Sequence, residues 1–414
     1  MVQIDAETRD VTVDLGGGLA LLPAQASAWV RPRSGGRAAA GHALAVGDVV
    51  EVEVRPGLVR RRGSSLPQVA LVPGLRAQGA LVAIEPHSRA VRAMVGGMPA
   101  DVGGFNRATQ ALRQPGSAFK PILYAAGLQA GAITPASICP DSPVVYLDPW
   151  TGKSWKPDNY ESGRYDGSIT YRTALQRSKN TCSVRLIQKL SPDPVLTMAR
   201  ALGIHSPLPR NLTLALGTGE TTVIELCNAY ASLAAAGQFA EPVLVRRVED
   251  KQGQVLLEAA SQSTAALPDN VAFILTSMMR SVIEGGTGSR AQMLGRPLAG
   301  KTGTSQGSRD AWFVGFAPQL AAAVWVGQDN NQPMGYETGA SAALPGWVRF
   351  MGMALAGEAP QDFARPSDVA CARIDARSGQ LSTAADALEE VFVAGTEPKP
   401  NTAPLQSIYL EEEP

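Results

Sequence analysis

Three short motifs, each occurring once and in a fixed order, contain the residues best suited to chemistry in this chain. They are Ser117-Ala118-Phe119-Lys120, Ser178-Lys179-Asn180 and Lys301-Thr302-Gly303-Thr304. Lysine is scarce, with 8 lysines against 29 arginines, yet each motif contains one. A serine hydroxyl becomes a good nucleophile when a base takes its proton, and a lysine in a desolvated pocket can be that base. The trio therefore indicates acyl transfer through a serine ester.

The first motif predicts a helix that begins at the nucleophile. Pro115-Gly116 is a typical helix start, and an apolar helical run follows from Ser117 through Leu128. The N–H of Ser117 is then free at the positive end of the helix, and Lys120 lies one turn further on the same face. Burial and a nearby cation such as Lys301 lower the pKa of a lysine amine, which suits Lys120 to take the Ser117 proton.

The second motif lies in a helical stretch predicted over Tyr171–Leu190. Ser178 and Asn180 stand two residues apart, so their side chains reach the same side only in extended or loop geometry. That geometry suits a Ser178 hydroxyl that relays a proton to the leaving amine and an Asn180 amide that holds the substrate backbone. The sequence gives no role for Lys179.

The third motif predicts an edge strand that binds substrate. The ammonium of Lys301 and the hydroxyls of Thr302 and Thr304 suit a carboxylate. Gly303 lets a substrate backbone lie close against the strand. The N–H groups of Thr304 and Ser117 are expected to form an oxyanion hole. One motif alone is more often a turn, a cap or a solvated face, so the interpretation depends on the ordered trio.

Changes in local composition and in secondary-structure signals divide the chain into three predicted parts. Residues 1–78 hold β-rich runs between Gly, Pro and Arg clusters and predict a small barrel-like β domain. The runs are Val11–Asp14, Ala28–Val30, Val49–Val54 and Val69–Val72. Residues 79–357 carry the motifs, and residues 358–414 form a tail with one β-rich piece at Val391–Ala394. Strands at both ends of the middle part, with helices between, favour an α+β domain whose sheet pairs early with late segments.

Apolar periodicity and turn signals place the other elements of the middle part. Two hairpins are predicted, one over Ala80–Ile84 and Ala90–Val95, the other over Ala311–Phe316 and Leu320–Gln328. Further helices are predicted over Leu226–Ala236, Val271–Glu284 and Leu344–Ala356. Residues 132–170 are predicted to be rich in loops.

Composition excludes several function classes. The 414 residues are 45% hydrophobic and 18% charged with a formal net charge of zero, which describes a globular protein without electrostatic affinity for nucleic acid. No stretch approaches the ~18 apolar residues that span a bilayer, and the polar N-terminus is no signal peptide. The four cysteines lack metal-ligand spacing, so no metal or cofactor is expected. Cys182 and Cys227 lie in apolar helical stretches, which favours buried free thiols.

Two other active-site patterns fail on context. Gly295–Thr302 matches the phosphate-binding loop motif, but no strand precedes it and no apolar helix follows, so a nucleotide site is not supported. A serine–histidine–acid triad is also disfavoured. Of the three histidines, His42 and His87 fall in the β domain and a hairpin turn, and His205 has the context of a surface or helix-end residue.

Longer runs around the motifs carry a family resemblance. They are Phe105–Gln110, Arg113–Pro121, Trp155–Tyr160, Leu214–Gly217, Gly286–Gly288, Ala299–Thr304, Asp310–Phe316 and Phe392–Pro398. Together they resemble the bifunctional, class A penicillin-binding proteins. The resemblance implies a D,D-transpeptidase in which Ser117 is acylated by the D-Ala-D-Ala end of a peptidoglycan stem peptide, with loss of D-alanine. The acyl group then passes to an amino group on a neighbouring strand, and β-lactams acylate the same serine and stay.

The resemblance also implies the surroundings of the site. The expected fold is that of the penicillin-binding and serine β-lactamase-like transpeptidases, with an antiparallel sheet flanked by helices, a helical subdomain and an OB-type domain over residues 1–78. The family's membrane anchor and glycosyltransferase domain are not in the chain. We therefore expect a soluble piece of a longer protein that sits on the outer face of the cytoplasmic membrane. Lys179 stands where many relatives have aspartate.

Two alternatives share the trio. A D-Ala-D-Ala carboxypeptidase or a β-lactamase-type hydrolase differs only in how fast water attacks the acyl-enzyme, which needs a positioned base. Glu220 and Glu225 lie between the second and third motifs, but no sequence argument puts either beside Ser117. A non-catalytic sensor domain would keep the pocket only to bind β-lactams. Kinetics alone separates the three.

Overall fold

The computed structural model describes residues 2–27, 44–50, 52–61, 64–71, 77–98, 104–147, 154–259 and 262–399. The chain divides into two compact units, Met1–Arg76 and Ala77–Pro414. Each unit is described by itself. The predicted divisions at residues 78 and 357 stay predictions.

The first unit is a small β structure. Its strands are β1 (Gln3–Ile4), β2 (Val11–Asp14), β3 (Leu19–Leu22), β4 (Val52–Arg61) and β5 (Ser64–Leu71), in the order β1-β2-β3-β5-β4. Val11, Val13 and Leu22 lie in its core. The predicted strand at Val11–Asp14 is confirmed, whereas Ala28–Val30 falls outside the described residues. The OB-type assignment stays a prediction.

The second unit is built on one antiparallel sheet. Its strands are β6 (Ala77–Ile84), β7 (Val91–Val95), β16 (Ala299–Thr304), β17 (Asp310–Ala317) and β18 (Leu320–Gln328), in the order β16-β17-β18-β6-β7. Both predicted hairpins are confirmed, and β6 pairs with β18 from the far end of the domain. The α+β prediction is therefore correct, and β16 is an edge strand, as the third motif predicts.

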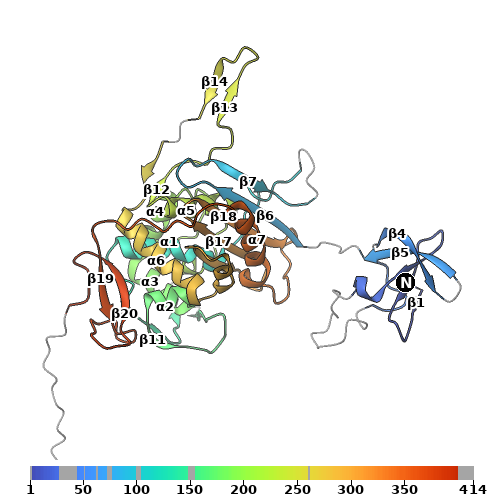
Figure 1. The fold of residues 1–414 in the computed structure, drawn as a ribbon. Helices are drawn as coiled ribbons and strands as arrows, with labels where there is room; N and C mark the ends of the chain where they lie inside the picture. Colours follow the sequence, from blue (N-terminus) through green and yellow to red (C-terminus); the bar gives the residue numbers. More distant parts are fainter. Residues whose placement is uncertain are drawn as a thin grey trace, which may run out of the picture. The chain divides into compact units, whose positions relative to one another are not determined.

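Helices cover both faces of this sheet (Figure 1). They are α1 (Lys120–Gln129), α2 (Tyr171–Gln176), α3 (Asn180–Leu190), α4 (Pro192–Ala201), α5 (Val223–Ala234), α6 (Asp269–Gly285) and α7 (Leu344–Ala354), with 3-10 turns η3 (Gly116–Phe119), η4 (Leu212–Leu216) and η5 (Ser289–Leu294) and a π-turn η6 (Gly339–Ala343). A further 3-10 turn, η1 (Ala24–Ser27), belongs to the first unit. Trp312 and Phe316 of β17 pack in one core with α5, and Phe313 packs in the other with Trp347 of α7. Burial on both faces explains why β17 has no exposed residue.

The helix predicted over Tyr171–Leu190 is wrong in one respect, because the chain breaks it into α2 and α3. Arg177, Ser178 and Lys179 form the break, and Ser178 has a φ of 59°. A residue in this left-handed region commonly ends a helix. The break leaves Ser178 outside both helices, in the loop geometry that its spacing from Asn180 requires.

The remaining strands form two-stranded ribbons. They are β8 (Ile138–Asp141) with β11 (Gly167–Thr170), β9 (Tyr146–Leu147) with β10 (Ser154–Trp155), β12 (Gln238–Phe239) with β15 (Thr264–Ala265), β13 (Arg247–Glu249) with β14 (Val255–Glu258), and β19 (Val369–Ile374) with β20 (Leu388–Val393). The β13–β14 ribbon projects from the body of the unit (Figure 1). The predicted β-rich piece at Val391–Ala394 overlaps β20, but its partner β19 was not predicted. Among the described residues, no helix has the length and apolar content to cross a bilayer.

One cysteine prediction is wrong. Cys182 is not a free thiol but forms a disulfide with Cys139, 43 residues earlier in the chain. Apolar helical context indicates burial, which is correct, but it carries no information about a partner on β8 brought close by the fold. Cys227 is free and buried, as predicted.

Candidate active site

Ser117 lies in η3, the short turn that leads into α1. Gly116 before it has a φ of 53°, and a Cβ at that position would lie 2.4 Å from the carbonyl oxygen of Thr304. Only glycine therefore lets this backbone approach β16 so closely. The first and third motifs meet at this contact, with Ser117 next to Thr304 as the predicted oxyanion hole requires.

The second motif completes the cluster from the break between α2 and α3. The Nζ of Lys120 lies 2.7 Å from both the carbonyl oxygen of Ser178 and the Oδ1 of Asn180, and 3.3 Å from the Ser178 hydroxyl. The Nζ of Lys301 lies 2.8 Å from the same hydroxyl. Two lysines from distant segments thus converge on Ser178. Within the described residues the Lys120 amine makes no hydrogen bond to Ser117, and such catalytic contacts are often loose in a free enzyme.

Both lysines are fully buried, which changes their acidity. Burial lowers the pKa of Lys120 well below its ordinary value, and the charge of Lys301 lowers it further. Burial also lowers the pKa of Lys301 to about 7. The site therefore holds an amine suited to accept a proton near neutral pH.

The free edge of β16 carries the predicted substrate-binding residues. The N–H of Ser305 donates to the carbonyl of Asp310, so by the alternation of an antiparallel ladder the N–H of Thr304 points away from β17. A Cβ on Gly303 would lie 2.2 Å from the carbonyl oxygen of Pro115. The hydroxyl of Thr302 lies 2.6 Å from that of Thr287. Gly303 therefore makes room for the backbone of Pro115, just before Ser117. The sequence had predicted that this space is left for the substrate backbone.

The domain described as the penicillin binding protein transpeptidase domain matches residues 79–344. The chain belongs to this family. Penicillin-binding protein 1A of Pseudomonas aeruginosa is 35% identical over 357 residues, 73% of this chain and 43% of that protein. Penicillin-binding protein 1A of Aquifex aeolicus is 36% identical over 340 residues, 82% of this chain and 46% of that protein. The chain thus spans less than half the length of these relatives.

Solved structures of penicillin-binding proteins agree with the fold. Penicillin-binding protein 1A from Haemophilus influenzae has a TM-score of 0.80 at 28% identity, covering 96% of this chain and 62% of that one. The PonA1 protein from Mycobacterium tuberculosis in complex with penicillin V has a TM-score of 0.62 at 32% identity, covering 70% of this chain and 81% of that one. The predicted resemblance to class A penicillin-binding proteins is therefore confirmed for the transpeptidase domain.

The transpeptidase domain also has supporting residues that the sequence interpretation missed. Lys179 pairs with Asp141 at 2.9 Å and with Asp166 at 3.0 Å. Asn159 accepts a hydrogen bond from the N–H of Asn180 and donates one to Asp141. Asn159 lies in a run already noted for family resemblance, so that run was the available signal. The residues next to Asp141 in the sequence do not predict its role, because its partners come from other segments of the chain.

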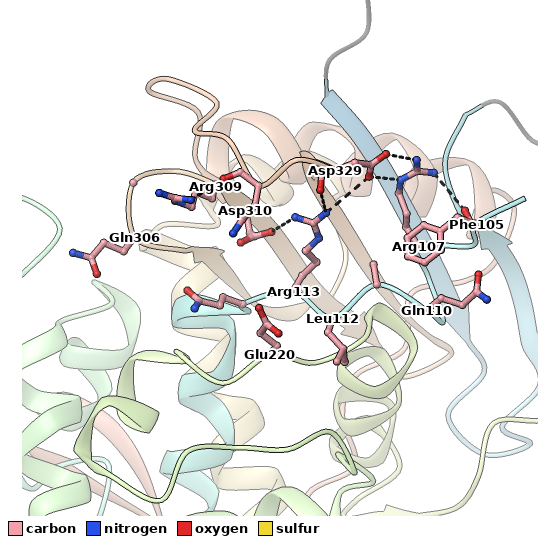
Figure 2. Close-up of a pocket in the computed structure, with 14 residues that line it drawn as sticks. Phe105, Arg107, Gln110, Leu112, Arg113, Glu220, Gln306, Arg309, Asp310 and Asp329 are labelled. Atoms are coloured by element: carbon pink, nitrogen blue, oxygen red, sulfur yellow. Dashed lines mark hydrogen bonds and ion pairs between the residues drawn. The ribbon is translucent and has the colours of Figure 1, made fainter.

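Two glutamates considered as bases in the penicillin-binding domain have different surroundings. Glu225 caps α5, accepting hydrogen bonds from Thr222, Thr221 and Ser206. These hydrogen bonds hold its carboxylate at the start of α5. Glu220 is exposed and lines a cavity (Figure 2).

The two rejected patterns do not correspond to sites in the fold. Lys301 and Thr302 lie within β16 rather than at a helix start, so the phosphate-binding loop geometry is absent from this described segment. The imidazole of His205 lies on the surface, 3.7 Å from Glu241.

Proposed function

We propose that this transpeptidase domain cross-links peptidoglycan stem peptides through an acyl-enzyme on Ser117. The observation that supports this most strongly is the convergence of Lys120 and Lys301 on the hydroxyl of Ser178, in the domain whose backbone brings Ser117 against Thr304. The site holds a nucleophile, a base of lowered pKa and a proton relay, which are the parts of a serine acyl transferase.

Acylation begins with proton transfer to Lys120. A neutral amine has two N–H groups, and those of Lys120 are used by its two acceptors at 2.7 Å, Ser178 O and Asn180 Oδ1. The lone pair is left to take the proton of Ser117. The Ser117 Oγ then bonds to the carbonyl carbon of the penultimate D-alanine. The N–H groups of Ser117 and Thr304 bind the resulting oxyanion.

The leaving amine receives its proton from Ser178. That hydroxyl accepts from Lys301 and Lys120, so its own hydrogen is free to point elsewhere. As the C–N bond breaks, Ser178 protonates the nitrogen of the terminal D-alanine and regains a proton from the Lys120 ammonium. D-alanine leaves. An acceptor amine then attacks the ester and gives up a proton to the same relay, and Ser117 recovers its hydrogen as the new amide forms.

Residues of the second and third motifs hold the donor peptide. The Nδ2 of Asn180 donates one hydrogen bond to the carbonyl of Asp158 at 2.8 Å, so its second N–H is available to a substrate carbonyl. The Lys301 ammonium and the hydroxyls of Thr302 and Thr304 bind the terminal carboxylate. β-Lactams present an equivalent amide and carboxylate and acylate the same serine.

We infer an extracytoplasmic setting for the domain. The Cys139–Cys182 disulfide supports it, because disulfides persist in oxidising compartments such as the bacterial periplasm. The greater length of the penicillin-binding protein 1A relatives supports a parent protein with a glycosyltransferase domain and a membrane anchor. Within this chain we assign residues 1–78 to an OB-type domain and residues 358–414 to a C-terminal tail.

Labelling with a fluorescent penicillin tests the proposal. Wild type should form a stable adduct over hours, and Ser117→Ala should form none. Wild type should also release D-alanine from a D-Ala-D-Ala peptide and transfer the acyl group to an amine. Loss of the label within seconds would favour a carboxypeptidase or β-lactamase. Stable label without turnover of any peptide would favour a sensor, and no label on folded wild type would rule out the site.

A further inference from the structure

A buried ion pair connects the C-terminal part of the chain to the helix that precedes the second motif. Glu390 lies on β20, beyond residue 344 where the matched transpeptidase domain ends, and its side chain is 4% exposed. Arg172 lies on α2, 218 residues earlier in the chain. The Nε of Arg172 donates to one carboxylate oxygen of Glu390 at 2.6 Å, and a terminal nitrogen donates to the other. The proposed mechanism does not use this pair.

Arg172 has all five of its N–H groups in hydrogen bonds. Two donate to Glu390, and the other three donate to α6. On α6 the acceptors are the carbonyl of Ser277 at 2.7 Å, the hydroxyl of Ser281 at 2.8 Å and the hydroxyl of Ser277 at 3.0 Å. A guanidinium holds its five donors in one plane, so acceptors on two sides fix its orientation. Since β20 also packs on α6 (Figure 1), Arg172 joins α2 to both elements.

The helix α2 determines where Ser178 lies. It has only six residues, Tyr171–Gln176, and the break that contains Ser178 follows almost directly. The N–H of Ser178 donates to the carbonyl of Leu175 at 3.1 Å, and the N–H of Lys179 donates to the carbonyl of Ala174 at 2.8 Å. Because the break is hydrogen-bonded to α2 through its backbone, a shift of α2 moves Ser178.

The same two helices lead to the third motif. The carbonyl of Gln176, the last residue of α2, accepts a hydrogen bond from the N–H of Thr287, two residues after the end of α6. The hydroxyl of Thr287 in turn lies 2.6 Å from the hydroxyl of Thr302 on β16. The position of α2 against α6 therefore affects the second and the third motif together.

We propose that Glu390 is a positioning residue for acylation. By orienting Arg172 it fixes α2 against α6, and α2 holds the Ser178 hydroxyl in place. The Nζ of Lys301 lies 2.8 Å from that hydroxyl, so a movement of about 1 Å breaks this hydrogen bond. The consequence for the rate rests on the proposed function, in which Ser178 protonates the leaving amine. A residue outside the matched domain thus contributes to the geometry of the active site.

The variant Glu390→Gln tests this role. Its NH2 group would face a donor of Arg172, so one of the two hydrogen bonds is lost. A concentration series with a penicillin separates the dissociation constant of the first complex from the first-order acylation constant. Since a misplacement of 1 Å can slow a reaction about 100-fold, we expect a smaller shift to lower the acylation constant about tenfold. The dissociation constant should not change, because Ser178 transfers a proton and does not hold the carboxylate.

Glu389→Gln is the matched control, because Glu389 is the exposed neighbour of Glu390 on the same strand. This control should acylate like wild type. Circular dichroism shows whether each variant is folded at the assay temperature. If Glu390→Gln does not fold, the double variant Arg172→Met, Glu390→Met replaces the buried pair by apolar side chains, which proteins often tolerate. It should still acylate about tenfold more slowly, because the directional contacts are gone.

A double-mutant cycle with Ser178→Ala distinguishes positioning from a general structural role. In the Ser178→Ala background, Glu390→Gln should cause no further loss of acylation, because the side chain that it positions is absent. The same fold loss in both backgrounds would overturn the proposal. An acylation constant that equals that of wild type in Glu390→Gln, or in the double methionine variant if that one is needed, would also overturn it.

Crystal structures of wild type and the two glutamine variants separate this proposal from the proposed function. In Glu390→Gln the Nζ of Lys301 should lie more than about 3.5 Å from the Ser178 hydroxyl, whereas Glu389→Gln should keep the hydrogen bond. An unchanged distance in Glu390→Gln would overturn the positioning role. A longer distance, in a protein whose wild type no penicillin acylates, would support the positioning of Ser178 and contradict the proposed function.

Discussion

The ammonium of Lys179 lies 2.9 Å from a carboxylate oxygen of Asp141, a side chain with no exposed surface. Burial alone would raise the pKa of Asp141, but hydrogen bonds from Thr181, Asn159 and Lys179 outweigh it and hold the pKa below its ordinary value. Since Thr181 follows Asn180 and Asn159 binds the N–H of Asn180, this carboxylate anchors the segment around the second motif. Lys179 therefore stabilises the second motif indirectly, through its ion pair with Asp141.

Replacing Lys179 by methionine should destabilise the domain. The change leaves the buried carboxylate of Asp141 without its cation, and breaking such a pair costs about 3 kcal/mol. Urea denaturation should show this loss in the free energy of unfolding, together with slower acylation by penicillin. Lys189→Met is the control, because the exposed Lys189 donates, among the described residues, only to the backbone carbonyl of Ala132. Equal stability of the two variants would contradict the anchoring role.

The acylation rate constant should have a bell-shaped pH dependence. It rises with pH as Lys120 loses its proton, which happens well below the ordinary lysine pKa. It should fall above about pH 7 as Lys301 loses the charge that we propose binds the carboxylate. Stopped-flow measurement with a penicillin at low concentration, where the rate reports on the free enzyme, gives both limbs.

Two substitutions at Lys301 test the assignment of these limbs. Lys301→Arg should remove the falling limb and keep the rising one, because arginine remains charged and still depresses the pKa of Lys120. Lys301→Met should move the rising limb to higher pH, because that repulsion is gone. A falling limb unchanged in Lys301→Arg would show that another group controls it.

The approach of Gly116 to Thr304 should control acylation. In Gly116→Ala the new Cβ meets the carbonyl oxygen of Thr304, which should displace the proposed oxyanion donor of that residue and slow acylation by roughly 100-fold. Gly131→Ala is a matched control, because its φ is 61° against 53° and no atom lies within 4 Å of the new Cβ. Both variants carry similar backbone strain, so only the first should lose penicillin reactivity.

The disulfide should contribute to stability. It closes a loop with a sequence separation of 43, for which the chain-entropy relation gives about 4 kcal/mol. The double variant Cys139→Ser, Cys182→Ser should therefore unfold at a lower urea concentration than wild type, and reductant should have no further effect on it. Cys371→Ser changes an exposed free thiol and should behave as wild type. Identical midpoints for all three proteins would contradict the bond.

The sequence alone was enough to predict the five strands of the main sheet and most helices of the second unit. Trp312 to Phe316 and Ala321 to Trp325 form apolar β-rich runs, and their pairing follows from the short turn between them. The start of α1 near Ser117 and the edge strand at Lys301 also follow from local patterns. These features depend on neighbours in the chain, which is why periodicity and turn residues predict them.

The sequence by itself was enough to predict which residues do chemistry, because the three motifs are recognisable by type, spacing and order. Only the tertiary structure decided what supports them: the left-handed conformation of Ser178, the pairing of Lys179 with Asp141, and the disulfide between Cys139 and Cys182. Each of these depends on contacts between segments far apart in the chain. Burial, pKa and disulfide pairing arise only when the fold brings such segments together.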